Sequence, residues 1–169
     1  IIAKNEPAWV YETTVYDSLL GGIDGFIPYA LAPEVTDGYR KSATFIMENQ
    51  SVLAGTTSCA EVAILNSYEQ TNYHYYGYNN SYTYIGKHIF PLFYSLSDMH
   101  IPVDYVTEPT EKKLRDYKVL ILDEIRNMSE KEAAVIEKWV SAGGHLIALG
   151  DICRNNIYEE PFAENPLKA

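Results

Sequence analysis

One stretch, residues 118–152, constrains the fold more than any other part of the chain, because it reads as strand, helix and strand in succession. Two uninterrupted apolar runs of strand length, 119–122 and 146–149, flank its central segment. Runs that are apolar on both faces are typical of strands covered by helices on both sides of a parallel sheet. We therefore expect a βαβ unit in which both strands are buried.

The segment between these two runs carries start and stop signals for a helix. Ser129 is placed as an N-cap, and Glu132 follows three residues later, where its carboxylate can reach the backbone amide of the cap residue. Apolar residues then recur at helical spacing up to Gly143 and Gly144, which can adopt the left-handed conformation that ends a helix. Local sequence thus predicts both ends of this helix.

The same alternation of strand and helix continues upstream. Residues 61–65 read as a further buried strand and residues 101–106 as another strand, and a long polar and aromatic loop at 66–82 and a helix at 83–99 separate them. Pro91 should kink that helix or mark a start nearer Gly86. The apolar face predicted for it consists of Ile85, Ile89, Leu92, Phe93 and Leu96. Four strands joined by three crossovers predict an α/β protein with a doubly wound parallel sheet.

Residues 1–54 follow a different plan of helix, strand and helix. We expect a helix at 9–20, a strand at 23–31 and a second helix with Tyr39, Ala43, Ile46, Met47, Gln50 and Leu53 on one face. A single strand between two helices has no partner for its hydrogen-bonding edges, so this part cannot form a domain by itself. Residues 55–60 are mostly small and form the predicted linker to a domain at 61–169.

Composition excludes several classes of protein. A net charge of −10 and a pI near 4.8 argue against a nucleic-acid partner, which requires clustered Lys and Arg. No apolar run approaches the ~20 residues of a membrane span. The four histidines lack metal-ligand spacing, so we expect no metal site. Because the chain begins at Ile1 without a methionine and ends mid-pattern, we expect both ends to be cut; the compartment stays open, with the cytoplasm slightly favoured.

Several segments together resemble a known domain. The succession EVAIL, IPVDYV, DYKVLIL, MSEKEAAVIEKWVSAGGHLIALGD and ENPLKA, preceded by GIDGFIPY, is similar to the trimerisation domain of family-42 β-galactosidases and related glycoside hydrolases. The resemblance implies a flavodoxin-like, class I glutamine-amidotransferase-like fold for 61–169, truncated at its C-terminus. It also implies that 1–54 is the last part of a (β/α)8 catalytic barrel.

The resemblance has functional implications. It implies a non-catalytic oligomerisation domain, a homotrimer in the intact protein, a carbohydrate substrate for the parent enzyme and no cofactor. The catalytic glutamates of such barrels would precede Ile1, and no residue here matches them. Retaining glycoside hydrolysis needs two carboxyl groups about 5 Å apart. This chain therefore supplies at most the rim of such a site.

Cys153 offers an alternative in which the chain is itself an amidotransferase-like thiol enzyme. Amidotransferases carry their cysteine on a tight turn after a strand, with small neighbours and a histidine further on. Here Arg154 and Asn155 follow the cysteine, and no histidine comes after it. A reactive thiolate also needs a base, so an inert thiol at the end of a strand is the favoured interpretation.

The tyrosine-rich segment at 66–84 follows the first strand of the predicted sheet, where open α/β folds place ligands. A subunit interface, a glycan contact in a stand-alone glycan-binding module and an ordinary surface loop all remain open, since tyrosine suits each of them. Its candidate substrate-binding residues are His74, Tyr75, Tyr76 and Tyr78.

Two further sets of residues lie at predicted strand ends. Tyr29 and Glu34 would face the mouth of the barrel, although Glu34 equally suits the start of the next helix. Asp123 and Glu124 end a central strand and are a weaker candidate site.

Overall fold

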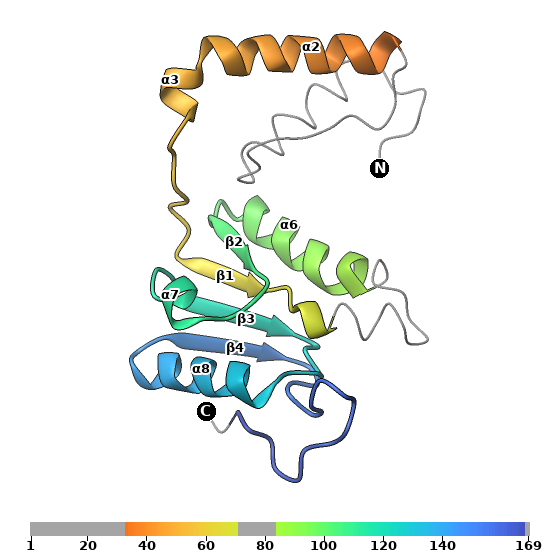
Figure 1. Ribbon diagram of the computed structural model, residues 1–169, viewed down its shortest axis with the longest axis vertical. Coiled ribbons are helices and arrows are strands. Elements are labelled where there is room, and N and C mark those ends of the chain that lie inside the picture. The colour runs from red at the N-terminus through yellow and green to blue at the C-terminus, as the bar shows by residue number, and fades with distance from the viewer. Residues whose placement is uncertain (1–32, 71–83, 168–169) are drawn as a thin grey trace. The chain divides into compact units, whose positions relative to one another are not determined.

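The computed structural model describes residues 33–70 and 84–167 of a chain that divides into two compact units, Ile1–Ser58 and Cys59–Ala169 (Figure 1). The described part of the first unit contains α2 (Pro33–Glu48) and α3 (Gln50–Leu53), separated at Asn49. The predicted second helix is thus present with a break. Ala43 and Met47 are exposed rather than part of one buried face. The helix predicted at 9–20 and the strand at 23–31 lie outside the described residues, so the barrel interpretation stays a prediction.

The second unit is built on a parallel sheet. Its strands are β1 (Val62–Leu65), β2 (Val103–Val106), β3 (Val119–Asp123) and β4 (His145–Leu149), in the order β2-β1-β3-β4 (Figure 1). This is the strand order of the flavodoxin-like class of doubly wound sheets. The predicted α/β fold class and all four predicted strands are confirmed.

Strand register assigns side chains to the two faces of the sheet. Ile64 is aligned with Tyr105 on one side and with Ile121 on the other, so their side chains share a face. The ring of Tyr105 stacks on Phe93 of α6 (Phe90–Asp98), with ring centroids 5.3 Å apart. We call this the α6 face.

The opposite face carries α7 (Glu111–Leu114) and α8 (Glu130–Ser141). On that face the Tyr117 hydroxyl donates a hydrogen bond to Asp104 Oδ2 at 2.9 Å. Parallel crossovers are right-handed, and the chain moves from β1 to β2 in one direction but from β2 through β3 to β4 in the other. The connecting helices therefore fall on opposite faces.

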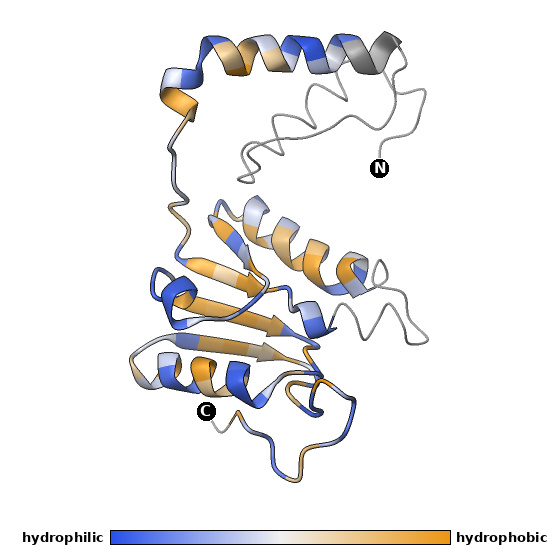
Figure 2. Cartoon of the chain, viewed as in Figure 1, coloured by the Kyte–Doolittle hydropathy of each residue, from blue (hydrophilic) through white to orange (hydrophobic). Residues whose placement is uncertain are grey.

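The core lies between these layers, and each of the four strands contributes apolar side chains to it (Figure 2). Ile85, Ile89, Leu92, Phe93 and Leu96, the predicted apolar face of the third helix, all belong to the core or pack against it. Its fully buried members include Ile64, Leu65, Leu114, Leu120, Leu122, Ile125, Met128, Ile136 and Cys153. Burying a side chain of this size contributes roughly 1.5–3 kcal/mol.

Helix α8 has the predicted ends. The Ser129 hydroxyl accepts a hydrogen bond from the Glu132 amide at 3.2 Å, and the Ser129 amide donates to Glu132 Oε2 at 3.0 Å, which completes the capping box. At the other end Gly143 has a φ of +105°. Both predictions are confirmed.

The helix predicted at 83–99 is present, but its first turn is wider than an α-helix. Residues Ile85–Ile89 form a π-helical turn, in which the Phe90 amide donates to Ile85 O, five residues back. Pro91 follows in the first turn of α6, where a missing backbone N–H costs little. The proline thus lies at a junction between two helical geometries.

The connection between β2 and β3 contains α7, whose N-cap Thr110 accepts a hydrogen bond from the Lys113 amide. Residues 68–70, expected as loop, are helical.

Strand β4 corrects a stronger expectation. We expected this strand to be buried on both faces, but it is an edge strand, and Ile147 and Leu149 are 44% and 41% exposed. Alternation directs both side chains to the α6 face of the sheet. Across the described residues, no helix combines the length and apolar character that a membrane span requires.

Candidate functional site

The sheet has a topological switch point between β1 and β3, because the chain leaves these neighbouring strands in opposite directions. In open α/β sheets, ligands bind outside the carboxyl ends of the strands at such a point. Here Asn66 follows β1, and Asp123 is the last residue of β3. The geometry of this edge is therefore the first place to look for chemistry.

His88 and Asp123 form a hydrogen-bonded pair at this edge. His88 Nδ1 lies 3.2 Å from Asp123 Oδ2, and the π-helical turn carries the histidine. Tyr84 supports the pair: its hydroxyl donates to the backbone oxygen of Asp123 at 2.8 Å, and its ring stacks on His88 with centroids 5.2 Å apart. Burial raises the pKa of Tyr84 far above its ordinary value, and the charges of Asp123 and Glu124 raise it further. The phenol is therefore a neutral donor.

The aspartate fixes the orientation of the imidazole, as carboxylates do for catalytic and ligand-binding histidines. With Nδ1 engaged, Nε2 lies on the far side of a ring whose side chain is 31% exposed. In the described part of the chain no hydroxyl or thiol side chain is hydrogen-bonded to His88. The pair can bind or orient a ligand, and no hydroxyl or thiol of residues 33–70 and 84–167 is bonded to the His88 ring for activation as a nucleophile.

A chain of ion pairs lies at the adjacent ends of β3 and β4. Arg126 contacts Glu124 at 3.3 Å and Asp151 at 3.6 Å, and Arg154 contacts the same Asp151 at 3.0 Å. Glu124 has a φ of +51°, unusual for a residue with a side chain. Each arginine of this chain of ion pairs is matched by a carboxylate.

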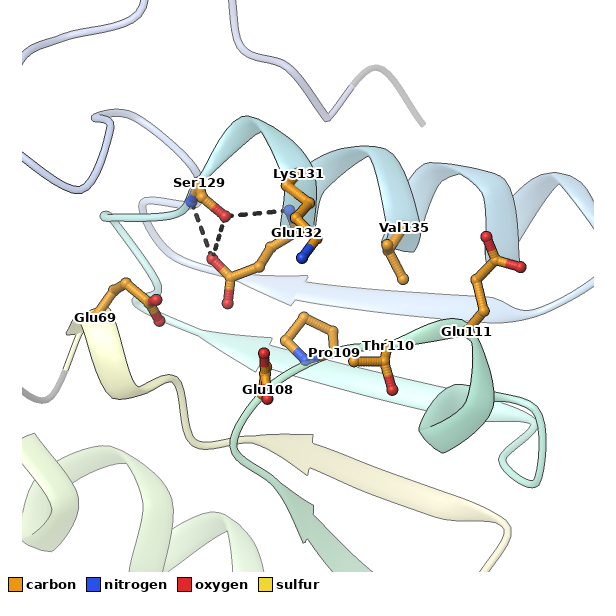
Figure 3. Close-up of a pocket in the computed structure, with 9 residues that line it drawn as sticks. All are labelled: Glu69, Glu108, Pro109, Thr110, Glu111, Ser129, Lys131, Glu132 and Val135. Atoms are coloured by element: carbon orange, nitrogen blue, oxygen red, sulfur yellow. Dashed lines mark hydrogen bonds between the residues drawn. The ribbon is translucent and has the colours of Figure 1, made fainter.

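A concave region of about 380 Å³ lies between the β2–α7 connection and the start of α8 (Figure 3). Its lining includes Glu69, Glu108, Glu111 and Glu132 but only one basic residue, Lys131. Burial raises the pKa of Glu132; its hydrogen bonds with Ser129 oppose this, and the charge of Glu69 adds to it. Within residues 33–70 and 84–167, no group of three or more His, Cys, Asp or Glu side chains is arranged to hold a metal ion.

Cys153 lies after β4, fully buried, in the left-handed region with a φ of +52°. Its amide donates to Ile125 O at 2.7 Å, which fixes the turn against the core. Burial raises the pKa of the Cys153 thiol to about 11, although a hydrogen bond from the Leu167 amide opposes the shift. At neutral pH the thiol is protonated, which gives the thiol-enzyme alternative no support.

The other residues proposed from the sequence are not brought together in the described structure. Glu34 lies in the first turn of α2. Tyr29, His74, Tyr75, Tyr76 and Tyr78 lie outside the described residues, so their roles stay predictions. Sequence reasoning noted Asp123 but missed His88, its partner 35 residues away. Only the position of the π-helical turn over the end of β3 reveals that pairing.

The fold defines the class of this protein as a doubly wound α/β domain. No protein-family model matches the chain, and a comparison with curated proteins finds no match. Solved structures do match.

The similar structures are glycoside hydrolases. A catalytic mutant of Gan42B, a GH42 β-galactosidase from G. stearothermophilus, matches with a TM-score of 0.67 and 18% identity over 95% of this chain and 26% of its own. The cold-adapted β-galactosidase from Rahnella sp. R3 matches with a TM-score of 0.62 and 20% identity over 78% of this chain and 20% of its own. For alpha-L-fucosidase isoenzyme 2 from Paenibacillus thiaminolyticus, the TM-score is 0.55 and the identity 20%, over 85% of this chain and 22% of that one.

These matches confirm, at the level of the fold, the resemblance to family-42 β-galactosidases. This chain spans about a quarter of the length of Gan42B, and it fits one domain of a larger glycoside hydrolase.

Proposed function

We propose that this chain is a non-catalytic oligomerisation domain of a larger, β-galactosidase-like glycoside hydrolase that assembles as a homotrimer. The observation that carries the proposal is the fold likeness that covers 95% of this chain but only 26% of a GH42 β-galactosidase. The carbohydrate substrate then belongs to the rest of the parent enzyme.

The chemistry of the second unit agrees with a structural role. The buried Cys153 is protonated at neutral pH, and the His88–Asp123 pair has no nucleophile beside it in the described residues.

An open apolar surface supports self-association. On the α6 face of β4, Ile147 and Leu149 are exposed; we call these two residues the open β4 face. An edge strand with unpaired backbone groups and exposed apolar side chains is a ready site for pairing with another chain. Its burial would contribute roughly 25 cal/mol per Å² of apolar surface removed from water. In the proposed trimer, a second copy of the chain covers the open β4 face.

Light scattering across a concentration series of residues 1–169 tests this proposal. We expect a trimer mass that Ile147→Lys reduces to that of the monomer, because a buried lysine charge opposes association. Met99→Lys, at a residue that is 64% exposed after α6, is the matched control and should leave the mass unchanged. A monomer at every concentration, or equal effects of both variants, contradicts assembly through this face.

An activity assay on the same sample tests the non-catalytic part of the proposal. We expect no turnover of an aryl galactoside. Turnover that survives repurification would contradict the non-catalytic part of the proposal.

A further inference from the structure

One acceptor at the carboxyl edge of the sheet is left without a partner. Asn66 Oδ1 is buried, and no described residue donates a hydrogen bond to it. A buried polar atom without a partner destabilises the folded state. Such an atom in a native protein points to a water molecule or a ligand group that supplies the missing donor.

Strand alternation places this acceptor on the same face of the sheet as the His88–Asp123 pair. The Asn66 amide donates to Val106 O at 2.8 Å, so the pairing of β1 with β2 continues through this residue. The pairing of β1 with β3 ends at Ile64 and Ile121, and alternation assigns Asn66 and Asp123, each two residues further on, to the α6 face at the carboxyl ends of these neighbouring strands. We call Asn66, His88 and Asp123 the switch-point cluster.

The helical geometry around His88 is also unusual. A π-helical turn is less favourable than an α-helical one and is frequently found at functional sites. Here it carries His88, whose Nδ1 bonds Asp123. This local geometry, the unpaired acceptor and the topological switch point coincide at one edge of the sheet.

The donors and acceptors of the cluster define the chemistry of a ligand. Asn66 Oδ1 and the Asp123 carboxylate accept hydrogen bonds, and His88 Nε2 can donate or accept one. A hydroxyl group both donates and accepts, and it is about the size of the water molecule that a buried acceptor otherwise takes up. A phosphate or carboxylate would face the charge of Asp123 with no surplus arginine nearby.

We propose that the switch-point cluster is a binding site for neighbouring hydroxyl groups of a neutral sugar. One hydroxyl donates to Asn66 Oδ1, and a neighbouring hydroxyl bonds the His88–Asp123 pair. The choice of a sugar among polyols rests on the proposed function of the chain. The site itself rests on the unpaired acceptor and the histidine pair, and it does not use Tyr75 or Tyr76.

A titration of residues 1–169 with D-galactose, followed by the imidazole resonances in NMR spectra, tests the site. We expect a saturable shift of His88, whereas His145 should not move, because it lies at the opposite end of the sheet at the start of β4. His88→Gln should weaken galactose binding, which the Glu124 amide resonance reports in this variant. His145→Gln is the matched control. Sodium phosphate serves as the anionic comparison and should cause no shift of His88.

Asn66→Leu separates binding from a merely structural role. Replacing a side chain whose buried Oδ1 is unpaired by an apolar side chain of similar size should leave thermal stability unchanged or higher. We expect the same substitution to weaken galactose binding about tenfold, the effect of losing one good hydrogen bond of about 1.4 kcal/mol.

Three results would overturn the proposal: the absence of a saturable His88 shift with galactose, a shift caused by phosphate instead, or unchanged galactose binding in Asn66→Leu. Light scattering on the same samples reports assembly independently. Failure of sugar binding and failure of the oligomerisation proposal are therefore distinguishable.

Discussion

Cys153 shows at the scale of one residue how packing decides reactivity. Its thiol is buried, with a pKa raised to about 11, whereas Cys59 in the same chain is exposed. At pH 7 a thiol with that pKa is thiolate in only about one molecule in ten thousand. We expect a thiol reagent to label Cys59 quickly and Cys153 only after unfolding, as followed by mass spectrometry of the two peptides. Equal labelling rates of Cys59 and Cys153 in the folded protein would support the thiol-enzyme alternative.

Glu132 gives a second prediction at this scale. Burial raises its pKa in the folded state, so the folded protein binds a proton more tightly than the unfolded chain does. The stability contributed by this proton is present below the unfolded pKa of about 4.3 and is lost as pH rises through the higher folded pKa. Glu132→Gln can still accept from the Ser129 amide and removes the buried charge.

We therefore expect Glu132→Gln to unfold with a flatter pH dependence above pH 4 and to be at least as stable as the parent at pH 7, measured by urea unfolding. Ser129→Ala is the contrasting variant: loss of the cap should cost about 1 kcal/mol. Ser141→Ala, at the exposed end of the same helix, should change little. A large loss of stability in Glu132→Gln at pH 7 would show that its charge is needed.

At the scale of elements, the ends of helices explain where glycine is required. Gly143 has a φ of +105° after α8, a conformation that side chains disfavour by roughly 1–2 kcal/mol. Gly86 lies in the π-helical turn, where an added Cβ would meet no atom within 4 Å. We expect Gly143→Ala to lower the free energy of unfolding by about 1–2 kcal/mol, and Gly86→Ala to leave it unchanged or raise it by up to about 1 kcal/mol. Thermal denaturation compares the two, and equal effects would contradict this account of the helix end.

At the scale of the whole molecule, charge opposes the proposed assembly. Each chain carries a net charge of −10, so copies repel one another while the open β4 face attracts them. Salt screens this repulsion, with a Debye length of about 10 Å at 0.1 M and 3 Å at 1 M. We expect the association constant from light scattering to rise with sodium chloride. Weaker association at high salt would indicate that ion pairs between copies, rather than apolar contact, hold the assembly together.

Local patterns in the sequence determined the elements of the second unit. The four strands follow from apolar runs, the start of α8 from the Ser129–Glu132 spacing, and the apolar face of the helix at 85–98 from helical periodicity. These features depend on neighbours a few residues away, which is why sequence alone is sufficient for them.

The arrangement of those elements was decided by tertiary structure. An apolar run reads the same at the centre of a sheet as at its edge, so only the order β2-β1-β3-β4 makes β3 buried and β4 exposed. The pairing of His88 with Asp123 spans 35 residues and needs the turn after Tyr84 to lie over the end of β3. The unpaired Asn66 and the burial of Cys153 likewise depend on which distant segments pack above them. Residue types suggest chemistry, but long-range packing determines which groups meet and which are kept from water.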